Sequence, residues 1–214
     1  MPRLTNEEIT DFLENILTQT ERDAIAVALE SENPWSHNDF EATTRSNLES
    51  AKIKIKVFHA ARVGQKCCYC GRSLVDATIE SDREHVIPKR KAKTLSYDLF
   101  NLSIACKRCN MTYKGEKTDH IVDFKSIETD FRNPSRYLIP HPNIDIYEDH
   151  LNRCTLQFDG KELTTYKCLT NKGKFLFDFV KLDRLCVNQF DVAQGGKPVN
   201  EEIERVFQQL RDGI

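Results

Sequence analysis

Residues 67–114 read CCYCGRSLVDATIESDREHVIPKRKAKTLSYDLFNLSIACKRCNMTYK, a segment framed by two pairs of cysteines. Cys67-x-x-Cys70 comes first, and Cys106-x-x-Cys109 follows after 35 intervening residues. Two such pairs supply four thiolates, which is the ligand set of a closed, tetrahedral zinc site. A closed site leaves no open position for a substrate. The spacing therefore predicts a structural zinc that stabilises the fold and takes no part in chemistry.

The other cysteines are interpreted as ordinary reduced side chains. The chain has eight cysteines in 214 residues, and its start has no apolar segment of the signal-peptide type. We therefore expect a cytoplasmic protein, in which closely spaced cysteines bind metal. Cys68 adjoins the first pair, but the C-x-x-C spacing favours Cys67 as the ligand. Cys154, Cys168 and Cys186 are scattered along the chain.

An acid, a histidine and two amides lie between and just after the cysteine pairs. Glu84 and His85 are adjacent, Asn101 lies in FNLSIAC, and Asn110 directly follows Cys109. Hydrolysis of a phosphodiester needs a base for water and a cation for the charge on the phosphoryl oxygens. A neutral histidine can be that base, and carboxylate and amide oxygens suit a hard cation. Singly, each of these residues is more often a surface or capping residue; together, at this spacing, they indicate a nuclease site.

The stretches CCYCG, REHVIPKR and FNLSIACKRCNMTYKGEK resemble the HNH endonuclease family, in its four-cysteine branch. The resemblance implies a ββα-metal finger, in which a β-hairpin, a loop and a short helix surround one catalytic cation. It implies that His85 is the general base, that Asn101 orients it, and that Glu84 and Asn110 bind Mg²⁺ or Mn²⁺. Glu84 stands where the family often has Asp, and Asn110 where it often has His. Both keep an oxygen ligand, which suits these cations.

Neighbouring residues on a strand point to opposite faces of the sheet. Glu84 and His85 can therefore serve one site only where a bulge or a strand end changes this alternation.

Basic residues are concentrated in the same part of an otherwise acidic chain. The formal net charge is −2, from 33 Asp and Glu against 31 Lys and Arg. Residues 83–117 hold nine basic residues and three acids, which gives +6 locally and −8 elsewhere. Such a concentration is typical of a surface that binds phosphate, although an ordinary solvated loop is the alternative. The expected nucleic-acid-binding residues are Lys89, Arg90, Lys107, Arg108 and Lys114.

Residues 1–64 are expected to be helical. Thr5 and Glu8 make a capping box for a first helix, and Thr20 can cap a second. A third helix is expected to begin near Ser36. Its apolar stripe, which should pack on the core, consists of Ile53, Val57 and Ala61.

The chain beyond the finger has strand and helix patterns. Residues 154–168, CTLQFDGKELTTYKC, predict a β-hairpin because Asp159-Gly160 makes a good two-residue turn. Residues 171–190 and 200–210 have helical spacing of apolar side chains. The sequence therefore predicts an α+β protein, with a helical region at 1–64, the finger and its zinc site at 65–125, and an α+β region at 126–214.

A looser resemblance extends beyond the finger. NPW (residues 33–35) and YLIPHPNIDIYEDHLNR (residues 137–153) are similar to HNH subunits of ATPase-paired anti-phage systems of the Septu kind. This resemblance implies a defence nuclease that acts with an ATPase subunit, and DNA is the expected substrate. Two alternatives stay open, an RNA-cleaving nuclease and a non-catalytic zinc module that binds nucleic acid or protein. No segment approaches the ~18 uninterrupted apolar residues that a membrane span needs.

Overall fold

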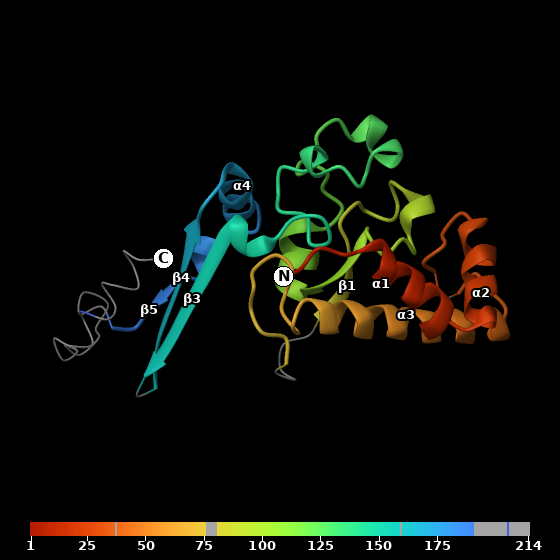
Figure 1. Cartoon of the computed structure of the whole chain (residues 1–214), viewed down its shortest axis with the longest axis horizontal. Helices are drawn as coiled ribbons and strands as arrows, with labels where there is room; N and C mark the ends of the chain where they lie inside the picture. Colours follow the sequence, from red (N-terminus) through yellow and green to blue (C-terminus); the bar gives the residue numbers. More distant parts are fainter. Residues whose placement is uncertain (37, 76–80, 159, 191–204, 206–214) are drawn as a thin grey trace.

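The fold was examined in a computed structural model, which describes residues 1–36, 38–75, 81–158, 160–190 and 205. It mixes helices and strands, as expected for the α+β class (Figure 1). Within these residues, no helix is long and apolar enough to cross a membrane. The longer elements are α1 (Asn6–Asp11), α2 (Gln19–Leu29), α3 (Ala42–Arg62), β1 (Ser81–His85), β2 (Leu102–Cys106), β3 (Leu151–Phe158), β4 (Lys161–Cys168), α4 (Asn171–Phe179) and β5 (Val187–Asn188). The short π and 3-10 helices are η1 (Phe12–Ile16), η2 (Lys93–Leu95), η3 (Arg108–Lys114), η4 (Phe124–Thr129), η5 (Pro134–Arg136), η6 (Tyr147–Asp149) and η7 (Leu182–Leu185).

Capping boxes begin the first two helices. Thr5 and Glu8 form the predicted box at the start of α1. The prediction that Thr20 caps the second helix is wrong, because Thr18 forms that box with Glu21. A capping box needs Glu or Gln three residues after the cap, and Glu21 stands at that distance from Thr18, whereas Thr20 already lies inside α2.

The buried face of α3 differs from the predicted one. The helix begins at Ala42 rather than near Ser36. Ile53 and Val57 are 58% and 63% exposed, so the predicted stripe is wrong. The buried face instead carries Leu48, Ala51, Lys52, Ile55 and His59. Because Lys52 and His59 are polar, a search for apolar spacing assigns this face to the solvent.

The finger consists of an antiparallel β1–β2 hairpin followed by η3. Glu84 pairs with Ser103 and His85 with Leu102, so both candidate residues lie at the end of β1. This order of strand, strand and short helix agrees with the ββα expectation. A long loop connects the two strands and contains the short helix η2.

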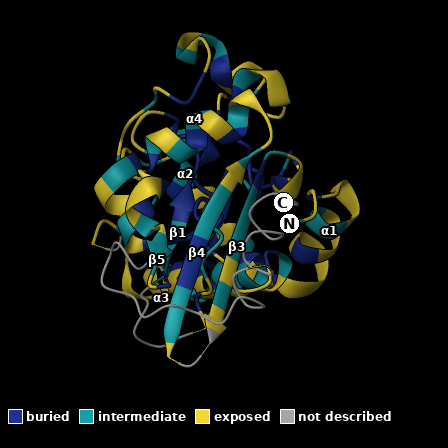
Figure 2. Ribbon diagram, turned by 90° about the vertical axis from the view of Figure 1, so that its left-hand side faces the viewer, coloured by how far each residue is buried: buried dark blue, intermediate teal, exposed yellow. Residues whose placement is uncertain are grey.

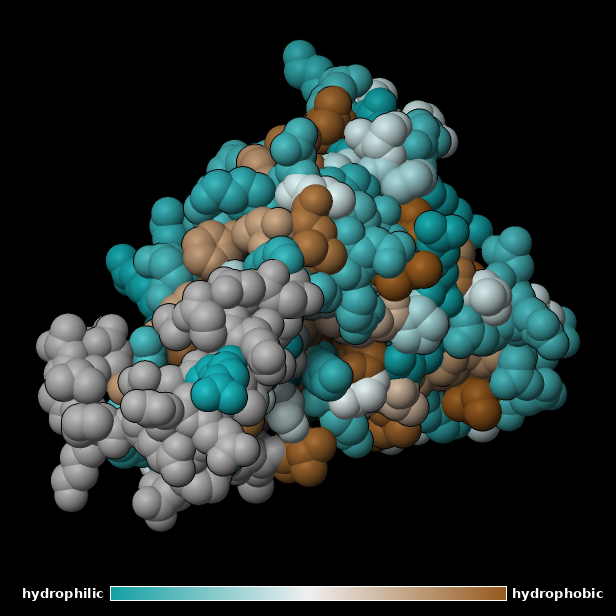
Figure 3. All heavy atoms as spheres, turned by 60° about the vertical axis from the view of Figure 1, so that its left-hand side comes forward, coloured by the Kyte–Doolittle hydropathy of each residue, from teal (hydrophilic) through white to brown (hydrophobic). Residues whose placement is uncertain are grey.

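Two hydrophobic cores meet at the finger, which is therefore packed on both sides (Figure 2). One core joins the N-terminal helices to Tyr97, Leu99, Phe100 and Leu102. The other surrounds the cysteine pairs and includes Tyr147, Leu151 and Leu176 of the C-terminal region. On the face seen in Figure 3, hydrophobic residues form small areas separated by hydrophilic ones.

The C-terminal region contains the predicted β-hairpin. β3 pairs with β4 from Leu151 opposite Cys168 to Phe158 opposite Lys161, and the hairpin projects from the body (Figure 1). The predicted helix at 171–190 is too long, because α4 ends at Phe179 and Lys181 adopts a left-handed conformation with φ of 53°. The expected helix at 200–210 lies outside the described residues, apart from residue 205.

Candidate metal centre and active site

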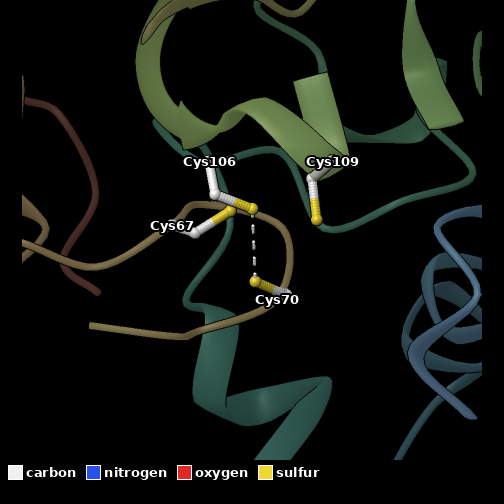
Figure 4. Close-up of side chains that lie close together, drawn as sticks. All are labelled: Cys67, Cys70, Cys106 and Cys109. Carbon is white, nitrogen blue, oxygen red and sulfur yellow. Dashed lines mark hydrogen bonds between the residues drawn. The ribbon is translucent and has the colours of Figure 1, made fainter. Parts of the chain in front are cut away.

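The four cysteines of the two pairs converge on one point. The sulfur atoms of Cys67, Cys70, Cys106 and Cys109 all lie within 4.8 Å of one another, and all four residues are buried (Figure 4). The Cys70 and Cys106 sulfurs are 3.9 Å apart. A zinc tetrahedron with Zn–S bonds of about 2.3 Å has edges of roughly 3.8 Å. The cluster therefore has the ligands and the spacing of a four-thiolate zinc site.

Three parts of the finger supply these ligands. Cys67 and Cys70 lie in a tight turn, in which the Gly71 N–H donates to the Cys67 carbonyl at 2.9 Å. Gly71 has a φ of 64°, a left-handed conformation that glycine adopts without steric cost. Cys106 ends β2, and Cys109 lies in η3. Cys68 is buried but lies outside the cluster, so the sulfurs that converge are those of Cys67 and the other three paired cysteines.

Glu84 is fully buried, and its carboxylate contacts the polar side chains of Tyr69 and Lys114. Its Oε1 atom accepts a hydrogen bond from the Tyr69 hydroxyl at 2.9 Å and lies 2.7 Å from Lys114 Nζ. The Oε2 atom is buried, and no hydrogen-bond partner is found for it within the described structure. Burial raises the pKa of the Glu84 carboxyl above its usual value, and the Lys114 ammonium opposes this shift. The free Oε2 is the atom of this residue with capacity for a further ligand.

His85, the last residue of β1, has side-chain partners different from those of Glu84. Its Nε2 atom is 3.0 Å from the Ser96 carbonyl oxygen. A carbonyl can only accept, so Nε2 carries the hydrogen and Nδ1 is the nitrogen able to take a proton. Burial, with the Lys89 ammonium nearby, lowers the pKa of the His85 imidazole to about 3. The ring is therefore neutral near pH 7.

Asn101 holds the loop after His85 rather than the imidazole. Its Oδ1 accepts from the Ile87 N–H at 2.7 Å, and its Nδ2 donates to the Ile87 and Leu95 carbonyls, each at 3.1 Å. The expected contact with the His85 ring is therefore corrected, because the Ser96 carbonyl takes that place. Both Nδ2 hydrogens are used on the backbone. Asn101 can thus affect His85 only through the loop that supplies Ser96.

A cleft of about 400 Å³ is joined to His85 through Trp35, whose ring contacts the imidazole; neither Glu84 nor His85 lines it. Its lining includes Asn110, one of the two expected cation ligands, and two acids that the sequence did not single out, Asp82 and Glu116. Arg83 and Lys89 add positive charge to the same wall, and the lining is completed by Trp35, Met111 and Gly115. The cleft therefore combines oxygen donors with cations that can bind phosphate.

The five expected nucleic-acid-binding residues have different environments. Lys89 lines the cleft, and Arg90 and Lys107 are exposed. Lys114 is 2% exposed and paired with Glu84, so its expected contact with nucleic acid is wrong. The Arg108 guanidinium donates to the carbonyls of Val180 and Lys181 at 3.0 and 2.6 Å, which gives it a structural role at the end of α4.

Three residues of the site escaped the sequence interpretation. Tyr69 holds Glu84, Ser96 holds His85 through its backbone, and the Trp35 ring centroid lies 4.5 Å from that of His85. Trp35 is far from His85 in sequence, and only tertiary packing brings the two together. Tyr69 lies between the two cysteines of the first pair, and this position could have marked it as part of the site, but the pattern of hydrophobic residues did not.

One of the comparisons with known proteins, with the models of protein families, gave a match. No curated protein and no solved structure matched the chain. The family model of the HNH endonucleases matches residues 67–117, a segment that begins with the first cysteine pair and ends just beyond η3. The match is confined to this segment, where it indicates an HNH-type domain with a nuclease-type function on nucleic acid.

Proposed function

We propose that this protein is a metal-dependent endonuclease that hydrolyses phosphodiester bonds in nucleic acid, with His85 as the general base. The observation that carries the proposal is the placement of the His85 ring. Its Nε2–H is held by the Ser96 carbonyl within the segment that matches the HNH family, which leaves Nδ1 as the basic atom. A neutral, oriented imidazole can take a proton from an attacking water.

Glu84 and Asn110 are the proposed ligands of a catalytic Mg²⁺ or Mn²⁺. Glu84 fits this role because Oε2 is buried and unpartnered within the described structure, while Oε1 is fixed by Tyr69 and Lys114. Asn110 lines the cleft. Such a cation, when bound, neutralises charge on the phosphoryl oxygens. The four thiolates hold a separate structural zinc, because a closed site of this kind has no open position.

DNA is the proposed substrate, and a role in anti-phage defence with an ATPase partner remains a prediction from the looser resemblance at residues 33–35 and 137–153. The charge distribution supports a partner. Of the five basic residues expected to hold phosphate, Arg108 and Lys114 are engaged within the protein. Few phosphate contacts give weak, salt-sensitive binding, so the isolated chain should cut slowly unless a partner holds the substrate.

The test is a cleavage assay on supercoiled DNA, linear DNA and RNA, with and without added Mg²⁺ or Mn²⁺. Cation should be omitted rather than chelated, because a chelator would also remove the structural zinc. We expect cleavage that requires the added cation, and faster cleavage of DNA than of RNA. Preference for RNA would favour the alternative of an RNA-cleaving nuclease.

The variant Asn110→Ala should need more cation for half-maximal cleavage. Asn15→Ala is the matched control, because this amide is exposed on η1 and bonds Asp11 at 2.8 Å. If the protein binds nucleic acid but cleaves none of the substrates, the nuclease proposal is wrong and the alternative, a non-catalytic zinc-binding interaction module, takes its place.

A further inference from the structure

Trp35 is a half-buried aromatic residue placed at the candidate base by contacts from two other parts of the chain. It lies between α2 and α3, and its carbonyl accepts from the buried Lys52 Nζ at 3.1 Å. The preceding carbonyl, of Pro34, accepts from the Tyr97 hydroxyl at 3.0 Å. The Trp35 and Tyr97 ring centroids are 4.9 Å apart. The position of the indole is therefore fixed by α3 and by the loop before β2.

The indole is not part of a closed core. Trp35 lines the cleft together with Asn110 and the cations Arg83 and Lys89, and its ring meets that of His85 at 87° with centroids 4.5 Å apart. The part of the ring that faces the cleft is apolar surface in contact with water, and a ligand that covers it gains free energy. The ligand must have an apolar face and reach the candidate base.

Positive charge flanks the same ring. Arg83 Cζ and Lys89 Nζ each lie over the indole, 5.8 Å from its centroid, and both residues line the cleft. Lys52 Nζ lies 4.8 Å from the same centroid. A planar apolar surface beside two cations matches the two parts of one nucleotide, its base and its phosphate. Aromatic side chains beside a positively charged groove are how proteins hold single-stranded nucleic acid.

We propose that Trp35 is a base-stacking residue and that the substrate is nucleic acid with an unpaired base next to the cleaved bond. This inference rests on the proposed function and names its substrate class. In a continuous duplex both faces of each base are covered by neighbouring pairs, so a base that stacks on Trp35 must come from a single strand or leave the helix. Arg83 and Lys89 bind the adjoining phosphate, which brings the bond to be cut close to His85.

The test uses the intrinsic fluorescence of the protein, because Trp35 is the single tryptophan of the chain. The zinc-loaded protein is titrated, without Mg²⁺ or Mn²⁺ so that nothing is cut, with a short oligothymidylate, with its fully paired duplex, and with an abasic strand of the same length. We expect saturable quenching by the oligothymidylate and little by the other two. Equal quenching by the abasic strand would overturn the proposal, because that strand has the phosphates without the bases.

Variants supply a second readout. Trp35→Leu should weaken binding of the oligothymidylate by roughly 5- to 150-fold, the value of one base–aromatic stack, and leave binding of the abasic strand unchanged. Trp35→Tyr should restore most of the affinity. Phe40→Leu is the matched control, since Phe40 belongs to the same segment and packs against the same N-terminal core as Trp35 but is not among the residues that line the cleft. Unchanged affinity in Trp35→Leu would also overturn the proposal.

The stacking proposal and the nuclease proposal fail in different ways. Base-dependent quenching without cleavage in added cation would contradict the nuclease function alone. Cleavage without base-dependent quenching would contradict the stacking role alone. If Trp35→Leu does not fold, as judged by its zinc content and circular dichroism, the comparison of strands on the wild-type protein still decides.

Discussion

Glu84 and Lys114 form an ion pair that is removed from solvent, with side chains 0% and 3% exposed. Lys114 Nζ also donates to the His85 carbonyl, so one ammonium joins the end of β1 to the end of η3. Removing one member of a buried pair is strongly destabilising because the other charge is left uncompensated. The pair thus holds the candidate cation ligand in place.

The variant Lys114→Met should therefore lower the free energy of unfolding by roughly 3 kcal/mol. Urea denaturation of the wild type and the variant measures this difference. Lys117→Met is the control and should change stability by less than about 0.5 kcal/mol, because Lys117 is exposed. A loss in Lys114→Met as small as that of the control would show that the pair is not structural.

Asn143 supports the turn that contains Asn101. Its Nδ2 donates to the carbonyls of Leu99, Phe100 and Leu102, at 3.1, 2.8 and 2.7 Å, and its Oδ1 accepts from Arg62 at 3.0 Å. Sequence inspection could find Asn101 through its spacing from the cysteines. It could not find Asn143, because its contacts with the turn cross more than forty residues and arise only from tertiary packing.

At the scale of elements, the sequence predicted correctly those features that depend on residues close together in the chain. The cysteine pairs, the Thr5 capping box and the hairpin of β3 and β4 each depend on residues a few positions apart, and the structure contains all three. The prediction for the buried face of α3 was wrong because that face includes the polar residues Lys52 and His59. Apolar spacing does not reveal their burial, which depends on tertiary contacts such as that of Lys52 with Trp35. Tertiary contacts decided that face.

The four-cysteine site should be necessary for the finger to fold. Cys106→Ser should lose the metal and unfold the finger, because the binding free energy of a structural zinc is also folding free energy. Metal analysis and the thermal unfolding curve measure the two effects. Cys68→Ser is a close control: this cysteine is equally buried and adjoins Cys67, but it lies outside the cluster. Retention of zinc in Cys106→Ser, or its loss in Cys68→Ser alone, would contradict the assignment.

At the scale of the whole molecule, buried histidines make stability depend on pH. Burial lowers the pKa of His59 and His141 to about 3 and that of His120 to about 4. A group with a lowered pKa in the folded state contributes stability that is complete above its unfolded pKa of about 6.5. That stability is lost as the pH falls towards the folded value. The protein should therefore become less stable between pH 7 and pH 5.

His59 allows a clean measurement of this effect. It lies on α3, belongs neither to the cysteine cluster nor to the lining of the cleft, and both ring nitrogens are buried without a partner in the described structure. The pKa of His59 is about 6.5 in the unfolded chain and about 3 in the folded protein. At pH 5 this difference lowers the free energy of unfolding by about 2 kcal/mol. The variant His59→Leu should lose about that much less stability than the wild type between pH 7 and 5, as measured by urea denaturation. Parallel losses in the two proteins would refute the account of His59.

The most direct test of the nuclease proposal is the single-turnover rate of DNA cleavage by the wild type and by His85→Ala, each with its zinc content determined. The account predicts that His85→Ala keeps its zinc and its affinity for DNA but cuts ~10²–10⁴-fold more slowly, which is the usual effect of removing a general base. Cleavage by His85→Ala at the wild-type rate would contradict the account, because the imidazole held by Ser96 would then have no part in the reaction.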